Sequence, residues 1–437
     1  TYGRYGGVGL TVGSDTKYDP AKNKIVRDDS RFLVVGALEG YAWDAGLRTG
    51  DHIVGIDGLP VKGKKLKEIT EMLRGAPGTD VVVSYTRDGA KGDQQTVLHR
   101  KLVEIPNVPV ATLLGDPKEA NAYIMLKSFA TDSGKEVKTA IKSLKKQAPN
   151  KKLNSVILDL RGNPGGLLTA AVDVAEAFVD GGVPIVSTLG RTAAAPSLAY
   201  SSSKDGPLIG KDTKVIVLTS GSTASAAEIV AGAIQDHDRG VVVGEKTYGK
   251  GLVQQVARLP FETSLKLTVA KYYTPSGRCI QSSEYKAGGV GREAAVEAER
   301  GQGKEFKFGD GTRFSSRKIA DGERKTFLTD NKRVVRDGGG IEPDVYVPAE
   351  RLTELEIALL DQNAFLEFVG KWAAEHPGQL DRSGVPAVDD ALYKEFVAFV
   401  EGRGGAATTR FDSALDDLGE AFKESKLAGL EGAVGDL

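Results

Sequence analysis

Sulfur-containing and metal-ligating side chains are scarce in this sequence. Cys279 is the single cysteine among 437 residues, so the chain can form neither an internal disulfide nor a cysteine-rich metal site. The four histidines are scattered, with no HExxH pattern and no pair at helical spacing. We therefore expect no metal site.

An excess of charge of one sign is also missing. Lys and Arg number 58 against 59 Asp and Glu, and this balance argues against a nucleic-acid or anionic-membrane binder. No apolar run approaches the roughly 20 residues that span a bilayer, so we expect no stable membrane insertion. The sequence begins at Thr1 without an initiator methionine or a signal-peptide pattern, and we expect either a removed leader or a fragment.

The periodicity divides the chain into regions, as expected for a length above that of one ordinary domain. Residues 1–103 combine glycine-rich turns with short strand-like runs and one amphipathic helix. Residues 122–281 alternate between strand and helix, which indicates βαβ units around a buried sheet. The elements expected there are strands at 155–160, 214–219 and 240–244, helices at 167–178 and 224–235, and a more exposed strand at 265–273.

The remaining regions are less regular. Residues 282–330 form a polar, charged excursion of uncertain structure. From residue 349 the apolar residues return at helical spacing, in one stripe from Leu352 to Leu360 and another from Leu392 to Val400.

A serine stands where the strand at 214–219 gives way to the helix at 224–235, in the segment SGSTASAAEI. Ser225 at this turn would expose its hydroxyl beside the free N–H groups of the helix, and the N–H of Ala226 would point at a developing oxyanion. Serine is also a preferred helix N-cap, so the pattern alone leaves capping as an open alternative.

A lysine on a glycine loop follows the next strand. Lys250 is flanked by two glycines, and it could serve as the base for Ser225 if burial disfavours its ammonium form. The alternative is an ordinary solvated lysine. His237 is the rival base, but about twelve residues of helix, or about 18 Å, would separate it from the serine. We interpret it as a helix-end histidine satisfied by solvent.

Five motifs resemble those of the C-terminal processing peptidases, also called tail-specific proteases, including plastid enzymes that trim the photosystem II reaction-centre precursor and bacterial periplasmic relatives. In addition to a glycine-rich N-terminal module, the motifs are DLRGNPGG (159–166), STASAAEI, VVGEKTYGKGLVQ, TVAKYYTPSGRCIQ (268–281) and GGGIEPD (338–344). The resemblance extends from this module to about residue 348.

The resemblance implies a role for each matching residue. Ser225 would be the nucleophile, Lys250 the general base and Gln254 a side chain that orients the lysine. The oxyanion hole would combine the N–H of Ala226 with one from the Gly165–Gly166 turn. The core would be similar to the crotonase-like fold of Clp peptidases, with no cofactor, and the location would be the plastid (thylakoid) lumen or the bacterial periplasm.

The N-terminal module resembles a PDZ domain. The segment YGGVGLTV (5–12) is similar to a carboxylate-binding loop and first strand, in which successive N–H groups can hold a terminal carboxylate. Ligand contact is expected at Gly7, Val8, Gly9 and Leu10, whereas Gly46, Gly50, Asp51 and Gly58 match positions that maintain the fold. Arg74 matches an arginine that couples this domain to the protease core, or it is simply a helix-terminal arginine.

Together these features predict an α/β multidomain protein: a PDZ domain at 1–103, a serine protease core at 104–348 and a helical extension at 349–437. We expect an endopeptidase that binds the apolar C-terminal tails of protein substrates and cleaves upstream of them. The extension would serve a homo-oligomer or an adaptor. The alternatives are a catalytically idle PDZ scaffold and an acyl-CoA enzyme of the crotonase type, for which no nucleotide-binding signature is present.

Overall fold

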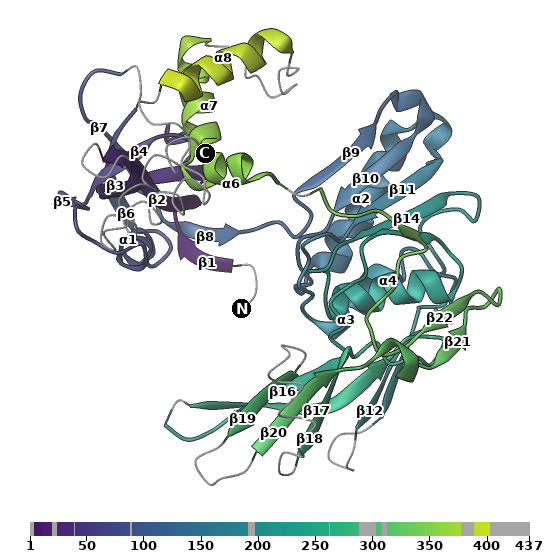
Figure 1. Cartoon of the computed structure of the whole chain (residues 1–437). Helices are drawn as coiled ribbons and strands as arrows, with labels where there is room; N and C mark the ends of the chain where they lie inside the picture. Colours follow the sequence, from purple (N-terminus) through teal and green to yellow (C-terminus); the bar gives the residue numbers. More distant parts are fainter. Residues whose placement is uncertain are drawn as a thin grey trace, which may run out of the picture. The chain divides into compact units, whose positions relative to one another are not determined.

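The structure of the chain is a computed structural model with two compact units (Figure 1). One unit combines Gly3–Ile105 with Glu350–Leu437, and the other is Pro106–Ala349. Each unit has its own apolar core. The structure describes residues 4–19, 24–38, 40–87, 90–190, 197–261, 263–287, 303–307, 313–350, 352–376 and 389–402.

The first unit contains an antiparallel sheet in the order β2-β3-β4-β6-β7, with β5 paired to β4. Its strands alternate inward and outward residues: in β6, Val81, Val83 and Tyr85 are buried. Ile69 and Leu73, four residues apart on α1, point into the same core. The elements are β1 (Arg4–Gly7), β2 (Leu10–Asp19), β3 (Lys24–Ala37), β4 (His52–Ile56), β5 (Leu59–Pro60), α1 (Leu66–Leu73), β6 (Asp80–Thr86), β7 (Gln94–His99) and β8 (Lys101–Glu104), which pairs with β1.

The described helices of the extension belong to this same unit. The Asn363 side chain donates to the backbone oxygen of Ser14, 3.4 Å away. A Cβ atom on Gly50 would lie 3.4 Å from the Cα of Gly370, so α7 approaches the turn before β4 closely. Aromatic rings join the last two helices: the centroids of Phe365 and Phe396 are 4.9 Å apart. The helices are α6 (Glu354–Asp361), α7 (Ala364–Glu375) and α8 (Asp390–Gly402).

The second unit is built on a six-stranded sheet in the order β23-β15-β14-β11-β10-β9. All neighbours are parallel except β9, which runs antiparallel to β10. Helix α3 packs against both α2 and α4, and α4 contacts both β15 and β12. The elements are β9 (Val110–Leu114), β10 (Asn121–Met125), α2 (Ser133–Gln147), β11 (Ser155–Asp159), α3 (Leu168–Ala175), β14 (Lys214–Thr219), α4 (Ala226–Asp236), β15 (Val241–Gly244) and β23 (Val345–Tyr346).

A second sheet in this unit has the order β13-β12-β17-β16. Residues 282–330, for which no structure was predicted, contain further strands, although 288–302 and 308–312 lie outside the described residues. The remaining elements are β12 (Pro184–Gly190), β13 (Leu198–Ser201), β16 (Leu252–Arg258), β17 (Ser264–Tyr273), β18 (Ser283–Ala287), β19 (Gly303–Lys307), β20 (Arg313–Lys318), β21 (Thr326–Leu328), β22 (Val334–Arg336) and the short 3-10 helices Pro117–Glu119, Pro149–Lys151 and Asp321–Glu323.

The strands and helices expected at 155–244 are confirmed, with differences confined mainly to their ends. The strand β14 matches its expected bounds, and the helix expected at 224–235 begins at Ala226 instead. Periodicity succeeds here because βαβ strands are buried on both faces and read as continuous apolar runs. The result is a mixed α/β fold.

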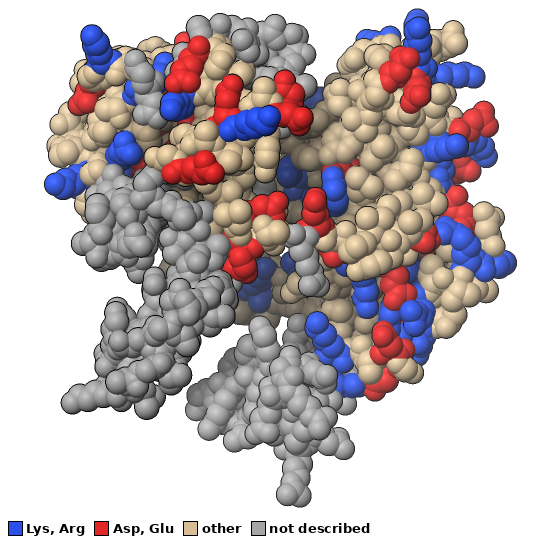
Figure 2. Space-filling view, turned by 45° about the horizontal axis from the view of Figure 1, so that its top comes forward, with Lys and Arg blue, Asp and Glu red and all other residues tan. Residues whose placement is uncertain are grey.

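The surface of the described residues carries charges of both signs. Figure 2 shows Lys and Arg interspersed with Asp and Glu on the face that it displays, with no continuous basic area there. None of the described helices has both the length and the apolar character that a membrane span requires.

The buried Asp51 carboxylate predicts a large contribution to stability. It accepts hydrogen bonds from Arg87, at 2.6 and 2.7 Å, and from the Arg48 N–H at 2.7 Å. We expect Asp51→Ala to lower the free energy of unfolding of this unit by about 3 kcal/mol, because it leaves these donors without their acceptor. Urea denaturation of the full chain measures this effect. The exposed Asp44→Ala is the matched control, and equal unfolding midpoints for the two variants would contradict the prediction.

Candidate active site

The proposed nucleophile and the DLRGNPGG segment lie at the same edge of the six-stranded sheet. Parallel strands present their carboxyl ends at one edge, and β11 ends at Asp159 while β14 ends at Thr219. The loops that follow these two neighbouring strands therefore meet, and one carries Ser225 and the other Gly165. Ligand and reaction sites of open α/β sheets occur at such an edge.

Ser225 occupies a strained backbone position immediately before α4. Its backbone φ and ψ angles are 59° and −117°, a combination that residues other than glycine rarely adopt. Its side chain makes no capping hydrogen bond with the helix, so capping does not occupy the hydroxyl. All eleven residues of α4 are buried, whereas Ser225, immediately before the N-terminus of this helix, is half-exposed. A serine on a sharp strand-to-helix turn is the arrangement of an exposed nucleophile.

The glycine turn lies directly against this serine. A Cβ atom on Gly165 would come within 2.7 Å of the Ser225 Cβ and 2.8 Å of the Ala226 nitrogen, so no other residue fits there. The Gly165 N–H donates to the Asn163 side chain at 2.8 Å. Within the described part of the chain, the N–H groups of Ala226 and Gly166 have no hydrogen-bond acceptor. Both are therefore open to an oxyanion.

Asn163 joins the two loops. Its side-chain nitrogen donates to the Leu126 oxygen at 2.7 Å, and its backbone oxygen accepts from Ala224 at 3.0 Å. The residue is fully buried, and its oxygen Oδ1 holds the N–H of Gly165. The glycine turn and the serine turn are thus tied through one asparagine.

The Glu228 carboxylate connects the serine to the lysine loop. Its Oε2 atom accepts the backbone N–H of Ser225 and that of Lys250, each at 2.8 Å. Its Oε1 atom accepts from Thr247 Oγ1 at 2.5 Å and from the Gly249 N–H at 2.7 Å. Because one oxygen atom holds both, the backbone nitrogens of Ser225 and Lys250 lie within two hydrogen-bond lengths of each other.

Burial and hydrogen bonding act in opposite directions on this carboxylate. Glu228 is fully buried, and burial raises its pKa above the ordinary value of a glutamate. The hydrogen bonds from Thr247, Lys250, Ser225 and Gly249 oppose that shift, because each favours the charged form.

The GGGIEPD motif supports the lysine loop from the other side. Thr247 donates its N–H to the Ile341 oxygen at 3.0 Å, and its hydroxyl accepts the Ile341 N–H at 2.7 Å. A Cβ atom on Gly340 would lie 2.6 Å from the Thr247 oxygen, so only glycine allows this approach. The loop is therefore held by residues far from it in sequence.

The side chains of Lys250 and Gln254 are placed less tightly. Lys250 is half-buried, and no hydrogen bond among the described residues joins its Nζ atom to Ser225 Oγ. Gln254 lies on the edge strand β16, where its side chain is exposed and makes no hydrogen bond within the described ranges. The roles expected for these two side chains stay predictions.

His237 lies at the far end of α4 from Ser225, as expected, but solvent is not its main partner. Its Nδ1 atom is 2.8 Å from the Asp330 carboxylate, and its Nε2 atom is 2.6 Å from the Pro184 oxygen. Its side chain is 11% exposed. The expectation of a histidine satisfied by solvent is therefore wrong, because the chain from β12 and the segment after β21 both reach this helix end.

The PDZ-like loop in the first unit presents a separate set of N–H groups. Gly7, the last residue of β1, is buried together with Val8 and Gly9, and the oxygens of Val8 and Gly9 accept from Ala42 and Leu38, respectively. The N–H groups of Val8 and Gly9 have no acceptor within the described residues. Leu10 is half-buried against the core of the unit.

Arg74 is exposed at the end of α1, where its backbone N–H donates to the Thr70 oxygen. This position agrees with the alternative that Arg74 is a helix-terminal arginine. The coupling role expected for it stays a prediction.

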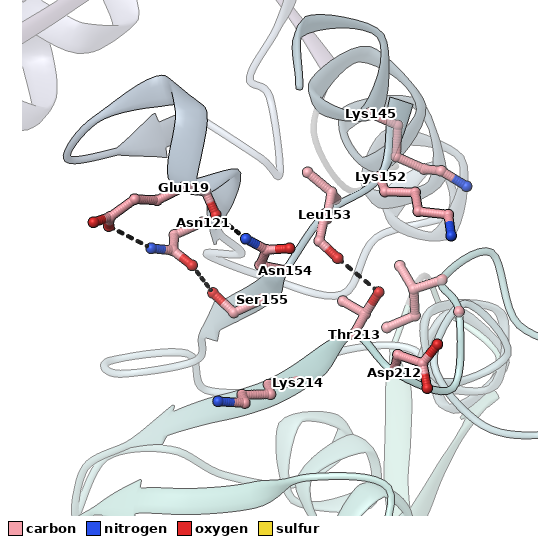
Figure 3. A pocket seen from close by; sticks show the side chains of 12 residues that line it. Glu119, Asn121, Lys145, Lys152, Leu153, Asn154, Ser155, Asp212, Thr213 and Lys214 are labelled. Carbon is pink, nitrogen blue, oxygen red and sulfur yellow. Dashed lines mark hydrogen bonds between the residues drawn. The ribbon is translucent and has the colours of Figure 1, made fainter. Parts of the chain in front are cut away.

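A pocket of about 670 Å³ opens at the opposite edge of the six-stranded sheet (Figure 3). Asn121, Ser155 and Lys214, the first residues of three parallel strands, line it. It is therefore separate from the serine site. No group of three or more His, Cys, Asp or Glu side chains among the described residues is placed to hold a metal ion.

Three residues of the site were not assigned from the sequence: Asn163, Glu228 and Tyr272. The Tyr272 hydroxyl donates to the Lys250 oxygen. For Glu228 a signal existed, since a glutamate three residues after a helix-opening serine has capping-box spacing. The contacts of the other two join segments far apart in sequence and leave no local pattern.

Three family models match the chain. Residues 120–290 match the model described as peptidase family S41, residues 34–87 a PDZ domain, and residues 355–431 the C-terminal helical domain of a probable PDZ-protease.

Curated relatives carry names of the same kind. A carboxy-terminal-processing protease of Bartonella bacilliformis is 36% identical over 64% of this chain and 60% of its own length. A chloroplastic C-terminal processing peptidase of Tetradesmus obliquus is 35% identical over 63% and 58%, respectively. A solved photosystem II D1 C-terminal processing protease aligns over 78% of this chain and 72% of its own, at 26% identity and a TM-score of 0.37. The chain thus spans about 60% of the length of these curated relatives.

The serine turn, the DLRGNPGG turn and the lysine loop lie inside the matched S41 segment, and the glycine-rich segment at residues 5–12 precedes the matched PDZ segment. The chain is similar to peptidase family S41 over residues 120–290 and to carboxy-terminal-processing proteases, with a segment that matches a PDZ domain before it and one that matches a helical domain after it.

Proposed function

We propose that this protein is a serine endopeptidase that captures the free C-terminus of a protein substrate and cleaves upstream of it, with Ser225 as nucleophile and Lys250 as general base. One observation carries the proposal: the backbones of Ser225 and Lys250 are held by the same oxygen atom of the buried Glu228. These two residues are 25 positions apart in the sequence, and this shared hydrogen-bond acceptor brings their backbones together at the N-terminus of α4.

The reaction follows from the positions of these groups. Ser225 Oγ attacks the scissile carbonyl carbon and transfers its proton to a neutral Lys250 Nζ. The carbonyl oxygen becomes an oxyanion, which the N–H groups of Ala226 and Gly166 stabilise together with the N-terminus of α4. Lys250 then returns the proton to the leaving amine, and water releases the acyl group from Ser225.

The lysine must move only its side chain to reach the serine. Its backbone nitrogen already lies within two hydrogen-bond lengths of the Ser225 nitrogen, and a lysine has a flexible four-carbon stem. Gln254, four residues further along the chain, orients Lys250 when its own side chain turns toward the site. The side chain of Gln254 is exposed and has no hydrogen-bond partner among the described residues, so it is free to turn toward the site.

The PDZ domain selects the substrate. The unoccupied N–H groups of Val8 and Gly9 bind the terminal carboxylate, and the edge of β2 after Leu10 pairs with the tail. An apolar final side chain fits beside Leu10, which packs against the core of the domain. Arg74 couples tail binding to the protease core.

The remaining assignments rest on kinship. We place the PDZ domain at 1–103, the protease core at 104–348 and the helical extension at 349–437, where the extension serves a homo-oligomer or an adaptor. Because relatives are described as chloroplastic or are bacterial processing proteases, we propose an extracytoplasmic location in a plastid lumen or a periplasm.

A catalytically idle PDZ scaffold is the second candidate. It is favoured by the absence of a hydrogen bond between Lys250 Nζ and Ser225 Oγ among the described residues. A serine-reactive phosphonate distinguishes the two, because only an activated serine forms a covalent adduct. A tryptic peptide carrying the adduct on Ser225 supports the peptidase, and its absence at saturating reagent supports the scaffold.

Removal of either member of the dyad should abolish turnover. We expect Ser225→Ala and Lys250→Ala each to lower kcat on a protein with an apolar tail by at least about a thousandfold, because each supplies an atom of the proton transfer. Cleavage is followed by mass spectrometry of the released tail. Ser222→Ala and Lys246→Ala, exposed neighbours on the same two loops, are controls with unchanged kcat. Full turnover by either dyad variant would remove the proposed mechanism.

The Glu228 carboxylate should be needed as an acceptor on both of its oxygens. We expect Glu228→Gln to lower kcat about a hundredfold, because one amide N–H₂ must then face two donors of the site. Glu119→Gln, the same change at the opposite edge of the sheet, should leave kcat unchanged. Equal kcat values for the two folded variants, measured together with their thermal unfolding, would contradict a role for this carboxylate.

The terminal carboxylate of the substrate should contribute to binding. We expect a tail peptide with a C-terminal carboxamide to show a KM about tenfold higher at nearly unchanged kcat, because hydrogen bonds from Val8 and Gly9 to a charged acceptor are lost. Steady-state kinetics on paired acid and amide peptides measure this difference. Identical KM values would exclude carboxylate capture by this loop.

A further inference from the structure

Tyr272 is a buried phenol whose hydroxyl contacts the proposed dyad. It stands near the end of β17 and is 2% exposed. Its backbone N–H donates to the Gly251 oxygen at 3.1 Å, and its hydroxyl donates to the Lys250 oxygen. Strand β17 therefore holds the segment that leads from the lysine into β16.

The peptide groups on both sides of the Lys250 Cα are thus held by buried side chains. Glu228 accepts the N–H of Lys250 at 2.8 Å, and Tyr272 donates to its oxygen. When both peptide groups of a residue are held, the direction of its Cα–Cβ bond is set. These two contacts consequently determine where the lysine side chain leaves the backbone.

The pKa of the Tyr272 hydroxyl lies above its ordinary value. Burial, followed by the nearby Glu228 carboxylate, raises that pKa, so the hydroxyl stays protonated. A neutral phenol can donate one hydrogen bond, which matches its contact with the Lys250 oxygen.

We propose that Tyr272 is a positioning residue of the dyad, which holds the Lys250 backbone through its buried hydroxyl group. This inference rests on the proposed peptidase function and deepens it. Tyr272 takes no proton from the substrate. Its loss leaves the Lys250 oxygen without a donor, so that the direction in which the lysine side chain leaves the backbone is no longer fixed.

The substitution Tyr272→Phe tests the proposal, because it removes the hydroxyl and keeps the ring that fills the core. In the full chain we expect kcat to fall about tenfold with KM unchanged, as the loss of one hydrogen bond implies. The rate of Ser225 labelling by a phosphonate should fall by the same factor. Tyr273→Phe is the matched control, since Tyr273 is only half-buried and its hydroxyl has no hydrogen bond in the described ranges.

A second replacement keeps the test decisive if Tyr272→Phe does not fold. Incorporation of difluorotyrosine at position 272 retains the ring and the hydroxyl but lowers the pKa of the hydroxyl. As pH rises and this phenol ionises, it can no longer donate to Lys250. We expect its kcat to decline at a pH where the wild type is still fully active, which a purely structural role would not produce.

The outcomes distinguish a failure of the role of Tyr272 from a failure of the peptidase function. A tenfold loss of kcat and of labelling for Tyr272→Phe, with a normal control, supports the proposal. Wild-type kcat in that variant, or a pH profile of the difluorotyrosine protein that superimposes on the wild type, overturns the role of Tyr272 and leaves the peptidase intact. A wild-type protein that neither cleaves nor labels removes the dyad, and the role of Tyr272 with it.

Discussion

The interaction on which the site depends is the set of four hydrogen bonds to the buried Glu228 carboxylate. Burial of a carboxylate costs several kcal/mol, and each hydrogen bond to a charged group returns about 1.5–3 kcal/mol. The four donors come from the turn before α4 and from the loop after β15. Neither segment can move away without leaving a buried charge short of partners, so the carboxylate holds Ser225 and Lys250 together.

The sheet supplies the frame for this interaction. Strands β11, β14 and β15 are parallel neighbours, so the loops that follow them emerge at one edge. Asn163 ties the first of these loops to the serine turn, and Ile341 supports the lysine loop through Thr247. Close approach then depends on glycine at positions 165 and 340, where a side chain would meet backbone atoms at 2.6 Å. Motifs that are distant in sequence thus pack together around Ser225, whose backbone φ is positive.

Much of the βαβ fold could be predicted because its signals are local in the sequence. Apolar runs predicted the strands of the βαβ region, and the position of the serine at the strand-to-helix turn made it a candidate nucleophile, with helix capping as the alternative. Lys250 carried no decisive local signal, since glycines flank many loop lysines, and only the resemblance to a family singled it out. Asn163 and Tyr272 were not found, because their importance arises from contacts between segments distant in sequence. His237 was placed at the correct helix end, but its partner Asp330 came from a stretch with no readable periodicity.

The most direct measurement is a crystal structure of the protein with a peptide phosphonate bound covalently at Ser225. The account predicts Lys250 Nζ at about 3 Å from Ser225 Oγ and the phosphonyl oxygen within hydrogen-bond distance of the N–H groups of Ala226 and Gly166. Glu228 should keep both backbone contacts in that complex. An adduct in which the Lys250 amine points into solvent, with another side chain beside the serine oxygen, would contradict the assignment of the dyad.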